Sequence, residues 1–180
     1  MRYIDSYEIP DFIYTMPYGY PHMAMAAGRT DMDPSDPYDP RSALPEALKL
    51  IEQAVLGESE DRAFYDFLIS EAPDSEDKKV ITGIRDNEIN HFDMFRRIYN
   101  ELTGKTLPPP ALSEFRKPAT YCAGLRKALM GEQNAVTKYR RILFAMMKRR
   151  HINMLTEIIT DELRHLGLYN YLYAKNKCAD

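Results

Sequence analysis

The chain has 180 residues, of which 44% are hydrophobic and 28% charged, and a formal net charge of -3. This length fits one domain with a core of ordinary size plus a tail. The charge and the absence of a basic stripe exclude nucleic acid as an expected partner. No apolar run approaches the ~20 residues that span a bilayer, and no secretory signal pattern opens the chain. We therefore expect a cytoplasmic protein that does not enter a membrane.

Residues 1–42 differ in composition from the rest of the chain. They contain six prolines, six tyrosines and no lysine. Proline removes a backbone donor and restricts the residue before it, so regular helix is disfavoured. Disordered segments are usually poor in aromatic residues. The pattern predicts an extended arm over 1–42 that lies on the rest of the chain or on a partner subunit, or else is loosely ordered, and its tyrosines favour docking.

The remainder, residues 43–180, has the pattern of helices joined by turns and one long connector. Apolar residues recur at helical spacing, and turn residues such as Pro73 and Gly104 separate the segments. No alternating β-branched run indicates a strand. The predicted helices cover residues 44–72, 75–103, 119–147 and 151–175.

The connector between the second and third helices is long. Its 15 residues from Gly104 to Pro118 reach ~46 Å when extended at ~3.1 Å per residue, which matches the ~43 Å of a 29-residue helix. The third helix can therefore start beside the start of the second. Two short-turned helical hairpins joined by one long crossover resemble the connectivity of a ferritin-like four-helix bundle. We therefore predict an all-α fold of this class.

A displacement of 74 positions superimposes the second half of the chain on the first. Polar and aromatic residues coincide as well as apolar ones, which two unrelated amphipathic hairpins would rarely show. The matched pairs include Gly57 and Gly131, Glu58 and Glu132, Tyr65 and Tyr139, Glu88 and Glu162, and His91 and His165. Two similar hairpins would each supply half of one site.

Spacing brings the matched acidic and imidazole side chains together. Glu88 and His91 are three residues apart on a helix and share a face, as do Glu162 and His165. Glu58 and Glu88 are equally far in sequence from the first hairpin turn, and Glu132 and Glu162 from the second. The residues expected to converge in one layer of the core are Glu58, Glu88, His91, Glu132, Glu162 and His165.

Four carboxylates cannot all stay ionised in a dry core without a large desolvation and repulsion cost. Two divalent cations would neutralise them. Two cations held by four glutamates and two histidines also resemble the ligand set of the di-iron and di-manganese carboxylate bundles. The six residues are therefore predicted to be metal ligands, with two iron ions or, alternatively, two manganese ions as cofactor.

The second half of the chain carries a specific motif. Glu132, 28 intervening residues and then Asp161-Glu162-x-Arg-His165 resemble the signature of carboxylate-bridged di-iron oxidases. The first half, with Asn87 in place of Asp161, is a looser copy. The resemblance implies that Glu88 and Glu162 bridge the ions while Glu58 and Glu132 each bind one. It also implies that Asn87 and Asp161 orient the histidines of the opposite hairpin.

Over residues 44–175 the chain looks most like rubrerythrin-type and bacterioferritin-type proteins. Two departures from those families matter. Rubrerythrins carry a further glutamate where this chain has Ala135, and bacterioferritins carry a haem-binding methionine where it has Ile89. We therefore expect no haem, and the movable extra carboxylate used in peroxide reduction is missing from that position.

Other candidate residues have weaker support. Tyr65 and Tyr139 lie seven residues after a ligand glutamate, hence near the same helix face. They are interpreted as core tyrosines bonded to a ligand, with a redox role as the alternative. Cys122 and Cys178 are expected to be free thiols without a role, and His151 a surface residue at the last turn.

The expected function is that of a non-haem di-iron protein that reacts with hydrogen peroxide or dioxygen, as a peroxidase or ferroxidase in oxidative-stress defence or iron handling. A peroxidase would need an external electron donor, because the sequence shows no second redox centre. The alternatives are a manganese catalase and a non-enzymatic iron-storage or scaffold protein. Resemblance to paired ferritin-like bundles makes a homodimer the expected assembly.

Overall fold

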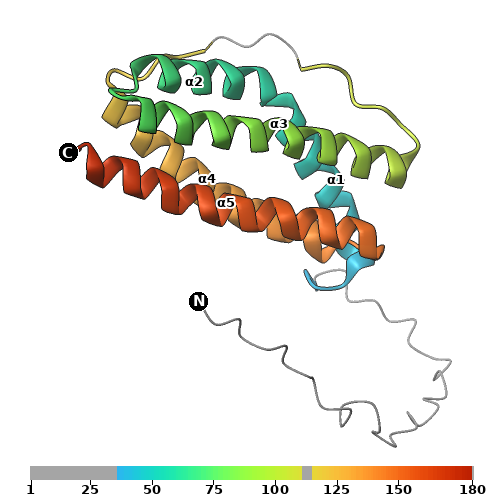
Figure 1. Cartoon of the computed structure of the whole chain (residues 1–180). Coiled ribbons are helices and arrows are strands. Elements are labelled where there is room, and N and C mark those ends of the chain that lie inside the picture. Colours follow the sequence, from blue (N-terminus) through green and yellow to red (C-terminus); the bar gives the residue numbers. More distant parts are fainter. Residues whose placement is uncertain (1–35, 111–114, 180) are drawn as a thin grey trace, which may run out of the picture. The chain divides into compact units, whose positions relative to one another are not determined.

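The structure is a computed structural model that describes residues 36–110 and 115–179. Within these residues it is all-helical, as predicted, and contains no strand. Residues 1–35, most of the predicted arm, lie outside the described residues. The five helices (Figure 1) are α1 Pro40–Leu56, α2 Glu58–Glu71, α3 Ser75–Thr103, α4 Tyr121–Phe144 and α5 Arg149–Lys175.

Helix α1 begins at Pro40, earlier than the predicted start at Leu44. The Asp39 side chain caps it by accepting a hydrogen bond of 2.8 Å from the backbone N–H of Arg41. Proline is well suited to the first helical position, because its missing N–H would have no partner there in any case. The proline-rich composition therefore concealed the true start of the helix.

The predicted helix 44–72 is divided in two at Gly57, which separates α1 from α2. Glycine is a weak helix former, so interrupting the backbone hydrogen bonds of the helix costs less free energy at Gly57 than at a neighbouring residue. Helix α3 keeps its predicted bounds. Asp74 caps its start, and Gly104 ends it with a left-handed φ of 71° that favours glycine.

The helices pack along one another as a bundle. Helix α4 packs against α5, α2 against α3, and α1 against both α3 and α4. Helices α3 and α4 both begin at the end of the bundle where the chain's C-terminal residues lie (Figure 1). The connector after Gly104 thus leads from one end of the bundle to the other. None of the described helices is both long enough and apolar enough to cross a membrane.

Two apolar clusters fill the core, and the polar residues singled out from the sequence lie between them along the helices. On α3, for example, Ile81 and Ile84 belong to one cluster, Phe95 and Ile98 to the other, and Glu88 and His91 fall in the interval. The same order recurs on α5, where Leu155 and Ile158 precede and Tyr169 and Leu172 follow the acidic and imidazole residues. One continuous buried stripe therefore contains a short polar interval.

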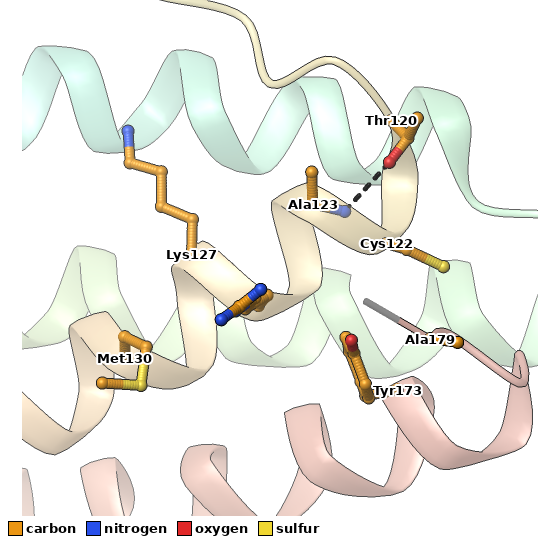
Figure 2. A pocket seen from close by; sticks show the side chains of 8 residues that line it. Thr120, Cys122, Ala123, Lys127, Met130, Tyr173 and Ala179 are labelled. Atoms are coloured by element: carbon orange, nitrogen blue, oxygen red, sulfur yellow. Dashed lines mark hydrogen bonds between the residues drawn. The ribbon is translucent and has the colours of Figure 1, made fainter.

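The two cysteines form a disulfide, so the expectation of two free thiols is wrong. Cys122 lies on the first turn of α4 and Cys178 just after α5, with their Cα atoms 5.5 Å apart. Figure 2 shows Cys122 beside Tyr173 of α5 and close to Ala179. The antiparallel packing of α4 on α5 brings together residues that are 56 positions apart in sequence. Sequence distance alone hid this proximity.

The expectation that His151 is a surface residue is also wrong. Its side chain is fully buried, and its Nε2 lies 2.9 Å from Oε2 of Glu101 on α3. His151 is on the first turn of α5, where that helix turns its inner face toward α3. A position close to a turn did not mean exposure, because the helix begins before the histidine.

A buried carboxylate ties three helix ends together near the disulfide. Asp77 of α3 is fully buried and is ion-paired with Lys175 of α5. It accepts hydrogen bonds of 2.9 Å from the Tyr121 hydroxyl and 2.7 Å from the Asn176 amide. Buried charges are tolerated when paired and hydrogen-bonded in this way.

We predict that Gly124→Ala destabilises the fold. A Cβ at Gly124 would lie 2.6 Å from Cδ2 of Leu68 and 3.1 Å from Cε1 of Phe67. Both side chains are buried and cannot move aside freely, so the loss should be about 1–3 kcal/mol. The control is Gly83→Ala, where nothing lies within 4 Å and a gain of about 0.5–1 kcal/mol is expected. Urea unfolding measures both, and equal effects would contradict the close approach of α4 to α2.

We predict that the disulfide contributes about 2–4 kcal/mol to the free energy of unfolding, because it closes a long loop in the unfolded chain. Adding a thiol reductant should therefore lower the melting temperature. The variant with Cys122→Ser and Cys178→Ser should melt at the lower temperature with or without reductant. A wild-type protein indifferent to reductant, with both thiols titratable, would refute the bond.

Candidate metal centre

The polar interval in the core consists of the six predicted ligands. Glu58 opens α2, Glu88 and His91 lie on α3, Glu132 on α4, and Glu162 and His165 on α5. None of the six residues exceeds 8% exposure. Helical spacing of three and four residues points them all inward, because they continue the apolar stripes of their helices.

Glu88 and Glu162 each reach both histidines, one oxygen to each. His91 Nδ1 lies 3.5 Å from Oε2 of Glu88 and 3.2 Å from Oε1 of Glu162. His165 Nδ1 lies 3.1 Å from Oε1 of Glu88 and 3.6 Å from Oε2 of Glu162. The imidazole centroids are 6.0 Å apart. Two carboxylates that each face both nitrogens could contact two neighbouring cations.

The outer nitrogen of each histidine faces a side chain of the other hairpin. His91 Nε2 lies 3.2 Å from Oδ2 of Asp161, and His165 Nε2 lies 3.4 Å from Oδ1 of Asn87. Arg164 donates to both acceptors, at 2.8 Å to Asp161 and 3.0 Å to Asn87. An acceptor at Nε2 keeps the proton there and leaves Nδ1 free as a ligand atom.

Four buried atoms of this layer form no well-directed hydrogen bond and face only one another, as His91–Glu162 and His165–Glu88 ion pairs. They are Glu88 Oε1, His91 Nδ1, Glu162 Oε1 and His165 Nδ1. Buried polar atoms are nearly always satisfied, so a cluster of unsatisfied ones requires an explanation. All four are good ligands for iron, manganese or zinc. One ligand atom each from Glu88, Glu132, Glu162 and His165 also lies within 4.8 Å of the others. The residues present fit a metal centre.

The histidines are basic in this setting. Burial alone would lower their pKa, but the facing carboxylates outweigh it. Glu162 and Glu88 raise the pKa of His91 to about 10, and Glu132, Glu162 and Glu88 raise that of His165 to about 11. Without a metal ion both rings are therefore protonated at neutral pH, and two imidazolium charges offset part of the buried negative charge.

The Glu132–Glu162 pair carries one proton, and it lies on Glu132. Burial and the adjacent Glu162 raise the pKa of Glu132 to about 9. Burial alone would raise the pKa of Glu162 too, yet its contacts with Glu132, His165 and His91 lower it. Glu132 thus holds the proton and Glu162 stays ionised. In the metal-free protein these protons offset part of the negative charge that bound cations would otherwise balance.

Glu58 is placed differently from the other five residues. Its Oε1 accepts a hydrogen bond of 2.6 Å from Arg62, and its Oε2 accepts one from Arg96 of α3. Neither oxygen faces a histidine within ion-pair distance among the described contacts. The structure thus brings five predicted ligands together and pairs the sixth with arginines.

A cavity of about 220 Å³ opens onto the layer between α2 and α4. Glu88, Glu132 and Glu162 line its inner part, together with both predicted tyrosines. Burial raises the pKa of Tyr65 and Tyr139 well above its ordinary value, assisted by Glu88 for Tyr65 and by Glu162 for Tyr139. Both phenols therefore stay protonated.

Sequence reasoning missed four charged neighbours of the layer. Asp61 lines the same cavity, and burial and the Glu88 charge raise its pKa to about 6. Arg62 follows Glu58 by one helical turn, so that pair could have been found from spacing. Arg164 stands inside the motif that identified the second half. The contact of Arg96 with Glu58 has no sequence signal, since it joins two different helices.

A buried set of four carboxylates and two imidazoles, placed between helices in the described part of the chain, could hold metal ions as the ferritin-like di-iron class of proteins does. The chain belongs to the rubrerythrin family, whose model matches residues 49–173. The family resemblance inferred from the motifs is confirmed. The chain is also 28% identical over 127 residues to the uncharacterized protein YhjR of Bacillus subtilis (strain 168), covering 71% of this chain and 86% of that protein. No solved structure matches the chain.

We predict that metal binding releases protons at pH 7. The imidazoles must lose their protons to bind a cation, and their pKa values of about 10 and 11 lie above the solution pH. Full loading should therefore release about three protons, two from the histidines and one from the Glu132–Glu162 pair. Apparent affinity should rise with pH between 6 and 8. Calorimetry of Mn²⁺ binding in buffers of different ionisation enthalpy counts the protons, and a count of zero would refute the assignment.

Proposed function

We propose that this protein is a non-haem di-iron protein that reacts with hydrogen peroxide or dioxygen, of the peroxidase or ferroxidase type. The observation that carries the proposal is the pair Glu88 and Glu162, each of which spans both histidines. In this proposal α1 and α2 together act as one helix of a ferritin-like four-helix bundle. Glu132 and Glu58 would be the outer carboxylates, one at each end of the site.

Two bound ferrous ions would supply two electrons to an oxidant in one encounter. The protein's own groups would prepare the site for this. Asp161, Asn87 and Arg164 hold the histidines in one orientation. The two apolar clusters exclude water from above and below the layer. Tyr65 and Tyr139, which line the cavity, would be the candidates to donate a hydrogen bond to a molecule that enters it.

A manganese catalase is the alternative that the same donors support, since oxygen and imidazole ligands suit manganese as well as iron. An iron-storage or scaffold protein without turnover is the non-enzymatic alternative. The family suggests iron over manganese. Nothing at Ala135 replaces the carboxylate that rubrerythrins carry there, so peroxide reduction in this chain would proceed without that group.

The electron donor, the assembly and the physiological role of the protein stay predictions from the sequence. These are an external electron donor, a homodimer, and a role in oxidative-stress defence or iron handling. A cytoplasmic location also stays a prediction, and the Cys122–Cys178 disulfide weighs against it, because cytoplasmic thiols are kept reduced.

We predict that Glu162→Gln greatly weakens binding of both ions, by about 100-fold or more, because this carboxylate faces both positions. The matched control is Glu157→Gln, an exposed glutamate on the same helix, which should bind as the wild type does. Metal content after anaerobic loading with Fe²⁺ and gel filtration gives the measure. Two ions per chain retained by Glu162→Gln would overturn the proposed centre.

Reaction of the loaded protein distinguishes the three functions. The reduced di-iron protein should consume about one hydrogen peroxide per site in stopped-flow absorbance and require reductant for further turnover. Oxygen evolution without reductant would identify a manganese catalase instead. Continued oxidation of added Fe²⁺, with a mineral retained by the protein, would identify storage.

A further inference from the structure

The two halves of the metal centre differ at their outer carboxylates. Glu58 has both oxygens engaged by guanidinium groups, from Arg62 one turn along α2 and from Arg96 of α3. Its side chain is only 4% exposed, so these contacts are made largely out of water. Hydrogen bonds in which both partners are charged are among the stronger ones in proteins. A cation that binds Glu58 must displace them.

Glu132, the equivalent residue of the second half, is free of such contacts in the described part of the chain. Its Oε2 lies 3.8 Å from Nδ1 of His165, directed into the layer. It also belongs to the group of four whose ligand atoms lie within 4.8 Å of one another, a group from which Glu58 and His91 are missing. The donors of one candidate metal position are thus gathered in the structure, whereas the outer carboxylate of the other is held by arginines.

The internal repeat shows that the arginines belong to the first half alone. The displacement of 74 positions that matches Glu58 with Glu132 places Val136 opposite Arg62 and Asn170 opposite Arg96. Neither can form an ion pair with a carboxylate. The same displacement places Ala135 opposite Asp61, which lines the cavity. The first half therefore has charged residues at three positions where the second half has neutral ones.

Arg96 is the stronger of the two competitors. Its side chain is 24% exposed, against 54% for Arg62, so it is less weakened by water. It also lies 4.0 Å from Asp93, one turn back on α3, which helps to hold it in place after Glu58 leaves. Arg96 can thus hold the Glu58 carboxylate in the metal-free protein and give it up when a metal ion binds.

We infer that Arg96, assisted by Arg62, competes with the metal for Glu58, so that the two ions bind in a fixed order. The ion between Glu132, Glu88, Glu162 and His165 binds first. The ion between Glu58 and His91 binds second and more weakly. Arg96 acts as a positioning residue, and the inference rests on the proposed metal centre.

The test is a titration of the full-length, metal-free protein with Mn²⁺, followed by electron paramagnetic resonance and calorimetry. The wild type should take up one ion and then a second, with a spin-coupled manganese pair only in the second phase. Arg96→Gln should strengthen the second phase by roughly tenfold and leave the first unchanged. Damage to the fold could not produce tighter binding. Arg97→Gln removes the same charge from an adjacent exposed residue and should behave as the wild type.

Two further variants separate the halves. Glu58→Gln should abolish the second phase and keep the first, whereas Glu132→Gln should weaken the first phase. If Arg96→Gln does not fold, Arg62→Gln should shift the second phase in the same direction by a smaller factor. An unchanged or weaker second phase in the folded arginine variant, or equal loss of both ions in Glu58→Gln, would overturn the order of binding. Failure of the wild type to bind two ions would instead refute the metal centre itself.

Discussion

The structure depends on one constraint: four carboxylates and two imidazoles are buried in a single layer between two apolar clusters. Leaving such charges without counterions would cost several kcal/mol per group even after relaxation. Protons on His91, His165 and Glu132 offset part of the charge, and two arginines offset that of Glu58. The helices thus bring together a polar set whose negative charge has to be balanced, by protons and arginines in the metal-free protein or by bound metal ions.

Much of the fold and the layer could be predicted from sequence. Residues three apart on a helix share a face, so Glu88 was expected on the same side as His91, and Glu162 on the same side as His165. The displacement of 74 residues supplied the second copy of each. Helix α3 kept its predicted bounds because residues with strong local preferences, Asp74 and Gly104, mark its ends. These features depend on neighbours in sequence.

What the sequence did not reveal depends on neighbours in space. The contact of Arg96 with Glu58, the disulfide between Cys122 and Cys178, and the burial of His151 against α3 each join different helices. Periodicity says which face of a helix is buried, and does not say which side chain of another helix it meets. The break at Gly57 was missed for a related reason: one glycine weakens a helix without deciding whether it ends there.

The disulfide divides the centre in a further way. It closes a covalent loop from Cys122 to Cys178, and this loop contains Glu132, Asp161, Glu162 and His165. The first hairpin, which carries Glu58, Asn87, Glu88 and His91, lies outside it. Local unfolding follows the least tethered parts of a protein. The covalent loop therefore keeps the ligand residues of α4 and α5 on one closed segment of chain, whereas those of α2 and α3 are joined to it by packing and by the connector alone.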